Sequence, residues 1–248
     1  MAKDLFSDRA ELYAKYRPTY PKELIEYVIS FANIKEWALD CATGNGQAAV
    51  LLAAFFQKVF ATDASPKQIS HAQQHPGVTY LREEAEKTSF DDNSFDLITV
   101  AQAYHWFDFE AFSAEAERIG KPGSIVAVWG YGRIMDSNNV LNHALSNFYT
   151  GVVGKFWDSE RKFIDQGYET IPFPFIELPS RKFKIQVNWK AEDFIGYLNT
   201  WSSVQNFKKA NHYNPVDKFW EELRSIWTDG SERGFSFPLF LRIGRIKK

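Results

Sequence analysis

The chain has little of several features that mark particular classes of protein. Its 248 residues include a single cysteine, Cys41, which excludes an internal disulfide and a cysteine-built metal site. No apolar run approaches the roughly 20 residues that a membrane helix needs, and charges spread through residues 1–30 leave no apolar signal core. We therefore expect a soluble, cytoplasmic protein, with Cys41 as an inert residue at a strand end.

An excess of one charge sign is also missing. Lys and Arg number 29 against 31 Asp and Glu, giving a formal net charge of −2. Without a basic surplus the chain shows no electrostatic footprint for nucleic acid. His71, His75, His143 and His212 lack ligand-like spacing, so we predict no metal. We expect a small-molecule substrate, no membrane or nucleic-acid partner, and a monomer or weak homodimer.

Aromatic residues, in contrast, are abundant. They make up 17% of the chain and include 22 Phe and 8 Trp. A Phe-rich core would explain this composition, and so would an aromatic chamber around a substrate. Many aromatics fall in the irregular stretch 134–180, for example Phe156 and Trp157, and this position favours the chamber.

Strand-like and helix-like segments alternate along the first 130 residues. The patterns predict strands at 37–40, 59–63, 78–81, 95–100, 124–129, 182–189 and 235–246. They predict helices at 48–56, from Pro66 after the cap residue Ser65, and at 108–119, 191–209 and 215–228. We expect Gly120–Gly123 to end the helix at 108–119.

This alternation predicts an α/β, doubly wound, mostly parallel seven-stranded sheet with helices on both faces. We treat residues 1–248 as one domain. Its expected parts are an N-terminal helical cap (1–33), a cofactor-binding core (34–133), an aromatic-rich lid inserted after the fifth strand (134–180), and C-terminal strands and helices completing the sheet (181–248).

The residues with chemical potential follow the ends of the first five strands. In an open parallel sheet these ends share one edge, where ligands bind. The segments concerned are 40–46, Asp63, 83–86, 101–107 and 129–133. Five such segments in register predict a ligand site at this edge.

The glycine segment has two possible interpretations. Gly44-Asn45-Gly46-Gln47-Ala48-Ala49 fits the dinucleotide fingerprint G-x-G-x-x-A, so an NAD(P)-dependent oxidoreductase is an alternative. Asp40, however, would repel a pyrophosphate at the helix N-terminus and would attract an ammonium group. Asp63, 17 residues past Gly46, suits ribose hydroxyls in either case.

Residues 37–129 resemble the class I S-adenosylmethionine-dependent methyltransferases, in particular the methyltransferase type 11 group, which have a Rossmann-like fold. The resemblance rests on Leu39-Asp40-Cys41-Ala42-Thr43-Gly44-Asn45-Gly46 and on Asp63, with Ala42 in place of the usual first glycine. It implies S-adenosyl-L-methionine as cofactor, held at its methionine end by the loop, at the ribose by Asp63 and at the adenine by Glu84 and the Ala85 amide. Glu86 would either join the adenine contacts or be solvated.

Two further segments are similar to a narrower set, the trans-aconitate methyltransferase-like proteins. They are Phe6-Ser7 with Tyr13–Pro21, and Ala101–Asp108. The first segment would fold over the cofactor, with Arg17 pairing the methionine carboxylate, or would form an amphipathic helix packed on the sheet. The candidate cofactor residues are together Asp40, Ala42, Thr43, Gly44, Gly46, Gln47, Asp63, Ala64, Glu84, Ala85, Gln102, Tyr16, Arg17 and Tyr20.

The methyl acceptor leaves fewer traces in the sequence. A carboxylate is already ionised at neutral pH and needs no base, whereas a phenol or amine would need His105, which has a structural role as its alternative. Trp106, Tyr131 and Arg133 are the candidate substrate residues. The expected activity is methyl transfer to a small molecule such as a carboxylate or another planar or apolar acid. A non-catalytic protein that binds S-adenosylmethionine is the second alternative.

Overall fold

The computed structural model describes residues 12, 15–137, 139–224, 226–227 and 231–248. These residues form one nine-stranded sheet with the order β3-β2-β1-β4-β5-β9-β6, in which β7 and β8 also pair with β9. The strands are β1 (Trp37–Cys41), β2 (Lys58–Asp63), β3 (Val78–Arg82), β4 (Phe95–Ala101), β5 (Gly120–Tyr131), β6 (Met135–Asp136), β7 (Ile176–Glu177), β8 (Phe183–Trp189) and β9 (Arg233–Arg245). The seven predicted strands are all present, and β6 and β7 add two short ones.

The first five strands run parallel, and β9 pairs antiparallel with β5, β6, β7 and β8. From β1 the chain continues outward to β2 and β3 on one side of the sheet, and from β4 it continues to β5 on the other side. The switch point therefore lies between the carboxyl ends of β1 and β4. The helix predicted at 108–119 ends at Ile119, before Gly120, as predicted, but the fifth strand begins at Gly120 and not at Ser124. The chain passes from its helix directly into β5, because Gly120 already pairs with Phe95 of β4.

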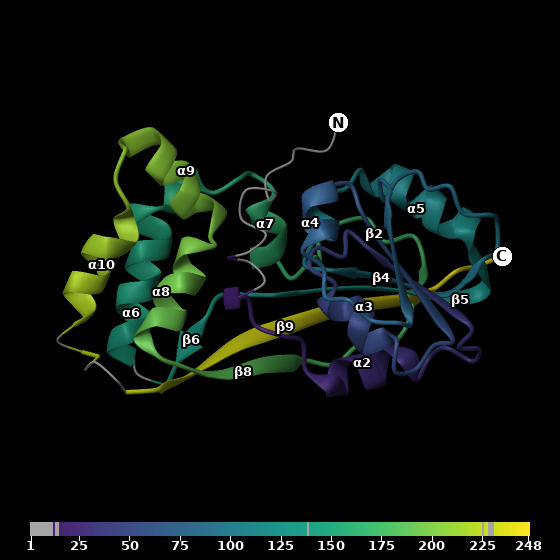
Figure 1. Cartoon of the computed structure of the whole chain (residues 1–248), viewed down its shortest axis with the longest axis horizontal. Helices are drawn as coiled ribbons and strands as arrows, with labels where there is room; N and C mark the ends of the chain where they lie inside the picture. The colour runs from purple at the N-terminus through teal and green to yellow at the C-terminus, as the bar shows by residue number, and fades with distance from the viewer. Residues whose placement is uncertain (1–11, 13–14, 138, 225, 228–230) are drawn as a thin grey trace.

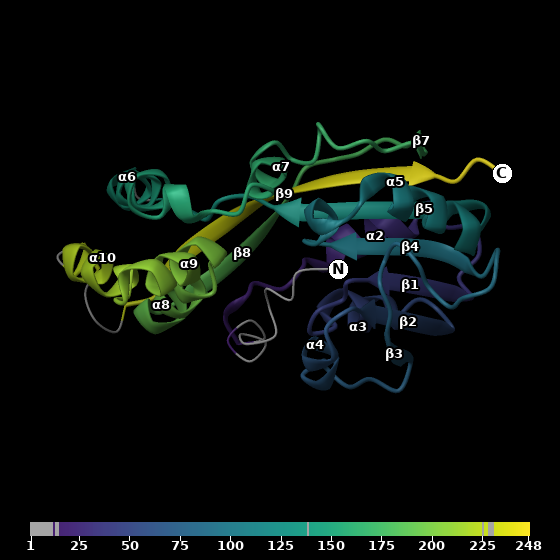
Figure 2. The ribbon, with the colours of Figure 1, turned by 90° about the horizontal axis from the view of Figure 1, so that it is seen from above.

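Helices cover both faces of the sheet, as predicted (Figure 2). On one face α2 (Lys22–Ile29) and α3 (Gln47–Leu52) bury Leu24, Ile25 and Leu52 against the strands. On the other face α5 (Phe109–Ile119) and α7 (Arg161–Asp165) contribute the buried Phe112 and Ile164. The alternation of side chains along each strand supplies both apolar layers.

A second group of helices lies to one side of the parallel strands, over the extended ends of β8 and β9 (Figure 1). We call this group the helical cap, which is separate from the N-terminal segment 1–33 that was expected to form a cap of its own. It consists of α6 (Asn139–Asn147), the π-helical turn η3 (Phe148–Val152), the 3₁₀ turn η4 (Gly154–Phe156), α8 (Ala191–Asn199), α9 (Ser202–Asn211) and α10 (Pro215–Leu223). The helix expected at 191–209 is interrupted at Thr200–Trp201. The expected lid (134–180) therefore supplies only part of the cap.

Aromatic contacts join the two parts of the cap. Phe148 stacks on Phe219 of α10 with ring centroids 4.3 Å apart, and Phe156 contacts Phe207 of α9 at 4.9 Å. Helices α9 and α10 thus pack on η3 and η4, because the aromatic side chains of both segments bury one another. Helix α8 packs on β9 of the sheet, where Phe194 stacks on Phe235 and Tyr197 contacts Phe237. Within the described residues, no helix has the length and apolar character to span a bilayer.

Candidate active site

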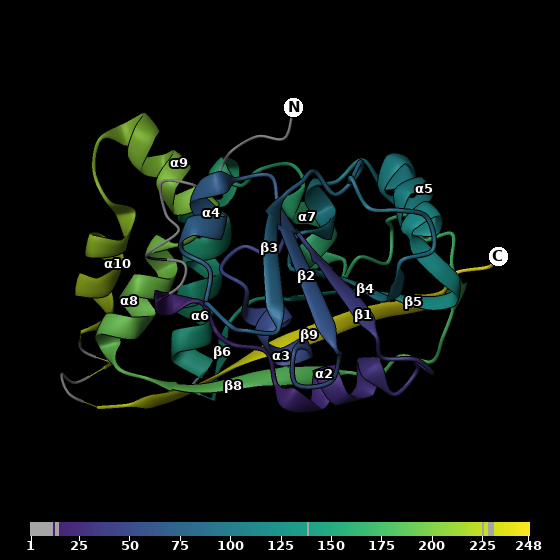
Figure 3. The ribbon, with the colours of Figure 1, turned by 45° about the vertical axis from the view of Figure 1, so that its right-hand side comes forward.

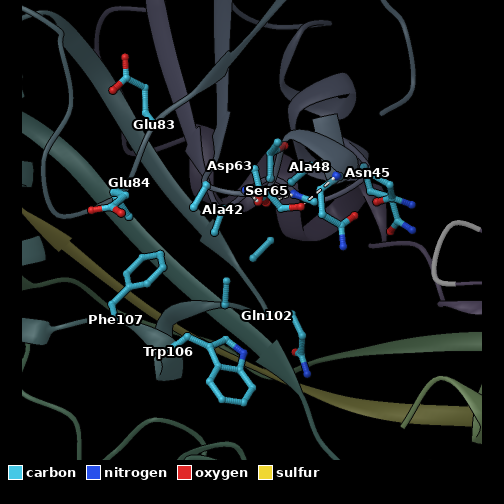
Figure 4. Close-up of a pocket in the computed structure, with 18 of the residues that line it drawn as sticks. Ala42, Asn45, Ala48, Asp63, Ser65, Glu83, Glu84, Gln102, Trp106 and Phe107 are labelled. Atoms are coloured by element: carbon cyan, nitrogen blue, oxygen red, sulfur yellow. Dashed lines mark hydrogen bonds between the residues drawn. The ribbon is translucent and has the colours of Figure 1, made fainter. Parts of the chain in front are cut away.

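A cavity of about 440 Å³ opens at the carboxyl ends of the parallel strands (Figure 4). This volume is in the range of small-molecule sites. The described residues that line it are Arg17, Pro18, Tyr20, Ala42, Thr43, Gly44, Asn45, Gln47, Ala48, Asp63, Ala64, Ser65, Pro66, Gln68, Arg82, Glu83, Glu84, Ala85, Glu86, Ala101, Gln102, Ala103, Trp106, Phe107 and Tyr131. Segments predicted from the ends of five strands therefore meet at one cavity.

The loop between β1 and α3 has a left-handed backbone at three positions. The φ angles are 50° at Ala42, 58° at Gly44 and 82° at Gly46. A β-carbon on Gly46 would lie 2.2 Å from the hydroxyl oxygen of Tyr80, so only glycine fits there without displacing that ring. Ala42 tolerates the same backbone region with a methyl group, although this conformation costs about 1–2 kcal/mol for an L-residue. The loop thus holds the start of α3 close to the cavity.

Asp40 does not line this cavity. It is fully buried beneath the loop, where its carboxylate accepts hydrogen bonds from the hydroxyls of Thr43 (2.6 Å) and Thr99 (2.7 Å). Burial raises the pKa of Asp40 to about 6, although both hydroxyl bonds oppose the shift. The sequence places this acid at the correct strand end, and the structure directs its carboxylate to the loop and to β4.

Asp63 at the end of β2 connects two strand ends. Its Oδ2 accepts from the amide of Gly44 (2.9 Å), and its Oδ1 accepts from the amide of Ser65 (2.9 Å). The Ser65 hydroxyl in turn accepts a hydrogen bond from the backbone amide of Gln68 and caps α4 (Pro66–Ser70). Asp63 is half-buried and lines the cavity, so its carboxylate is fixed at the wall (Figure 4).

Acidic side chains follow β3 on the same wall. Glu83, Glu84 and Glu86 line the cavity with the buried Ala85 between them. The Glu83 carboxylate accepts from the Ser89 hydroxyl at 2.6 Å, and Glu84 is exposed. Glu86 accepts from the amide of Asp108 at 3.1 Å, ahead of α5, so this side chain has a structural bond as well as a place at the cavity.

Aromatic and amide side chains form the opposite wall, beyond β4 and β5. Trp106 is the last residue of the 3₁₀ turn η2 (Tyr104–Trp106) and Phe107 follows it, and both face the cavity across from Glu84 (Figure 4). Gln102 has a left-handed backbone (φ 58°), and its Oε1 accepts from the Tyr131 amide at 2.7 Å. Its amide is therefore bonded to the end of β5.

Arg17 and Tyr20 complete the cavity from the N-terminal segment. Arg17 Nη1 donates to the Tyr131 hydroxyl at 2.8 Å, and Nη2 donates to the Thr200 carbonyl of the cap at 3.3 Å. The guanidinium group also lies 5.5 Å from the Tyr197 ring. One cationic side chain thus joins the end of β5, the cap and the cavity.

Besides Asp40 and Gly46, three more predicted site residues lie outside the cavity lining. His105 is buried with its Nδ1 2.9 Å from the Tyr168 hydroxyl, and burial lowers its pKa to about 3. Arg133 lies 3.5 Å from Asp165 and 4.0 Å from the Tyr149 ring centroid. The Tyr16 ring packs on Gly196 of α8, at a distance that leaves no room for a β-carbon. The structure gives each of these residues a packing or ion-pair environment outside the cavity lining.

Comparisons with known proteins explain this arrangement. The model of the methyltransferase domain family matches residues 39–128, the segment that carries the glycine loop and Asp63. Over 249 aligned residues the chain is 31% identical to a methyltransferase of Dictyostelium discoideum, covering 98% of this chain and 95% of that relative. The chain belongs to the class I S-adenosylmethionine-dependent methyltransferases.

A solved structure supports the assignment over nearly the whole methyltransferase. A type II methyltransferase of Anaeromyxobacter dehalogenans is 36% identical, with a TM-score of 0.86 over 94% of this chain and 99% of that one. A methyltransferase of Aspergillus candidus is 31% identical over 202 residues, covering 69% of this chain and 63% of that relative. These relatives give no support to the oxidoreductase or to a non-catalytic protein. The trans-aconitate resemblance stays a prediction, and its residues 6–7 and 13–14 lie outside the described part of the chain.

The cofactor of this family fits the cavity wall. Gly44 has a left-handed backbone and no β-carbon, so a ligand can approach the backbone of the loop closely at this point of the wall. Gln68 contributes a buried amide oxygen that has no hydrogen-bond donor among the described residues. A ligand with several hydroxyl and amino donors, such as S-adenosylmethionine, matches this oxygen and the carboxylates of Asp63 and Glu84.

Sequence reasoning missed several lining residues of the methyltransferase. They are Ala48, Ser65, Pro66, Gln68 and Arg82. The lining residues Pro18, Asn45, Glu83, Ala101, Ala103 and Phe107 lie within predicted segments, although none was singled out as a cofactor-binding residue. For Gln68 a signal existed, because the Ser65-Pro66 cap predicts a helix that starts beside Asp63. Inspection of the first turn of that helix would have found it.

Gly46 and Asp40, in contrast, were predicted as cofactor residues and do not line the cavity. They carry the family motif and were predicted to touch the cofactor, yet the structure gives them supporting positions behind the lining residues.

Proposed function

We propose that this methyltransferase transfers the methyl group to a carboxylate of a small planar acid. The observation that carries the proposal is the position of the side chains around the cavity that could accept a proton from the methyl acceptor. Among the described lining residues there is no histidine, lysine or cysteine, and the carboxylates Asp63, Glu83, Glu84 and Glu86 follow β2 and β3. The wall beyond β4 and β5 is formed by Gln102, Trp106 and Tyr131.

The cofactor would lie along the strand ends, from β3 towards β5. Glu84 and the Ala85 amide would hold the adenine, Asp63 the ribose, and the loop at Thr43 and Gly44 the methionine end. Arg17 would pair with the methionine carboxylate, as a guanidinium group does with carboxylates. When bound, S-adenosylmethionine supplies a methyl group on a positively charged sulfonium sulfur. Transfer of this methyl group leaves the sulfur as a neutral thioether.

The acceptor would then lie against Trp106, Phe107 and Tyr131. Flat aromatic side chains suit a planar molecule and exclude water from it. A carboxylate with a pKa near 4 needs no base at neutral pH. His105 does not offer one, because its lowered pKa of about 3 and its bond to Tyr168 make it a poor proton acceptor. The residues of this wall therefore act by aligning the acceptor.

Methyl transfer to a panel of small acids tests this proposal. Purified protein is incubated with methyl-labelled S-adenosylmethionine and planar carboxylic acids, each beside its carboxamide as matched control. We expect saturable transfer to at least one acid, none to its carboxamide, and a product that mild alkali hydrolyses as a methyl ester. Because no base takes part, the rate should change less than about threefold between pH 7 and pH 9.

Transfer to phenols or amines alone, with a rate rising steeply over this pH range, would contradict the carboxylate proposal. Binding of S-adenosylhomocysteine in the same preparation shows that the cofactor site is intact, so an inactive panel then counts against the proposed acceptor and not against the family.

A further inference from the structure

Gln68 has an unusual environment at the cavity. It lies on the first turn of α4, 5% of its surface is exposed, and it lines the cavity next to Asp63 and Ser65. Its Oε1 atom is buried and has no hydrogen-bond donor among the residues that the structure describes. Buried side-chain oxygens are nearly always hydrogen-bonded, so this one calls for an explanation.

The local structure fixes the place of this side chain. The Asp63 carboxylate holds the Ser65 amide, and the Ser65 hydroxyl accepts from the Gln68 amide at 3.3 Å. Gln68 Oε1 also faces the glycine loop, since a β-carbon on Gly44 would lie 4.0 Å from it. The oxygen is thus held between the loop and α4, close to the carboxylate that is bonded to both.

An unpaired buried acceptor destabilises the free protein, and a ligand that supplies the missing donor recovers that free energy on binding. Asp63 ends β2 and Gln68 lies in the helix after it, whereas the acidic residues on the adenine side follow β3. We infer that Gln68 is a cofactor-binding residue. Its side-chain Oε1 accepts a hydrogen bond from one ribose hydroxyl. Asp63 and Gln68 then share the two hydroxyl donors.

This inference rests on the cofactor of the family and is independent of the acceptor proposed above. It assigns to Gln68 two opposite effects. The side chain strengthens cofactor binding, and its unpaired oxygen lowers the stability of the free protein. A residue that only packs would affect both quantities in the same direction.

Calorimetry with ribose-modified ligands tests the inference. Gln68→Met retains the side-chain length without the acceptor, and Gln57→Met, at an exposed position, is the matched control. The ligands are S-adenosylhomocysteine and its 2′-deoxy and 3′-deoxy forms. We expect Gln68→Met to weaken S-adenosylhomocysteine binding about 5- to 10-fold. We also expect it to bind one of the deoxy forms as tightly as the wild type does, within about twofold, because that form lacks the hydroxyl concerned.

Thermal unfolding of the free proteins gives the second measurement. The Tm of Gln68→Met should equal or exceed that of the wild type, and Gln57→Met should match the wild type in both experiments. Unchanged affinity for S-adenosylhomocysteine in Gln68→Met would overturn the inference. Equal weakening of all three ligands together with a lower Tm would overturn it as well, because packing alone then explains the residue.

Discussion

Asp40 has a carboxyl group that water does not reach. It is fully buried, and Thr43 and Thr99 supply hydroxyl donors to both of its oxygens. Hydrogen bonds from two neutral hydroxyls do not replace hydration of a charge completely, so its pKa rises from 3.8 to about 6. Its position between the glycine loop and β4 makes it a structural support of the site.

The raised pKa has a consequence for stability against pH. Between pH 3.8 and pH 6 the folded protein holds a proton on Asp40 that the unfolded chain releases. The stabilisation from this group is therefore complete below pH 3.8 and is lost as the pH rises through 6. A shift of this size corresponds to at most about 3 kcal/mol.

Asp40→Asn tests this argument, because asparagine does not titrate. Between pH 4 and pH 7.5 the free energy of unfolding of the wild type should fall relative to that of the variant by about 2–3 kcal/mol. Urea unfolding of both proteins at both pH values measures the difference. A difference that stays constant with pH would show that the carboxyl group is ionised with an ordinary pKa.

At the scale of elements, Trp201 joins the two segments of the helical cap. It lies between α8 and α9 with 5% of its surface exposed. Its ring centroid is 6.1 Å from Phe148, 5.4 Å from Trp157 and 5.9 Å from Tyr197. Removing this ring leaves a void that neighbours from two separate segments would have to fill.

We expect Trp201→Ala to lower the free energy of unfolding by about 3 kcal/mol or more. S-adenosylhomocysteine affinity should stay within a few-fold, because Trp201 lies outside the lining residues. Tyr213→Ala, at a side chain that is 56% exposed, is the control and should lose less than about 1 kcal/mol. Denaturant unfolding compares the two, and equal losses would contradict the role of Trp201.

The strands of the core could be predicted and the cap could not, for a physical reason. Parallel strands bury both faces and alternate with helices, so their periodicity and turn residues are visible locally, as at Phe95–Val100. The partners of helices α8 to α10 depend on which aromatic surfaces meet in space. Phe148 and Phe219 are distant in the chain, and local pattern contains no signal that they stack.

The same distinction holds within the site. Asp63, Glu84, Gln102, Trp106 and Tyr131 line the cavity, because the end of a parallel strand fixes their place, and their roles in binding stay predictions. Rotamers decide the rest: the sequence does not show that the imidazole of His105 turns to Tyr168, nor that Arg133 pairs with Asp165.

At the scale of the whole molecule, the N-terminal segment connects two distinct parts. Figure 3 shows the parallel strands and the helical cap side by side. Arg17 bonds to Tyr131 at the end of β5 and to Thr200 in the cap, and Tyr16 packs on Gly196 of α8. Since Arg17, Tyr20 and Tyr131 also line the cavity, its architecture depends on core and N-terminal segment together.

We propose that the cavity at the strand ends binds the cofactor through Asp63. Calorimetric titration with S-adenosylhomocysteine tests it most directly, on the wild type, on Asp63→Ala and on Asp91→Ala, an exposed aspartate, as control. Saturable binding to the wild type and to Asp91→Ala is expected, with affinity lower by about 10- to 100-fold in Asp63→Ala, because ribose hydroxyls lose their charged acceptor. Circular dichroism confirms that the variant is folded. Wild-type affinity in a folded Asp63→Ala protein would contradict the account.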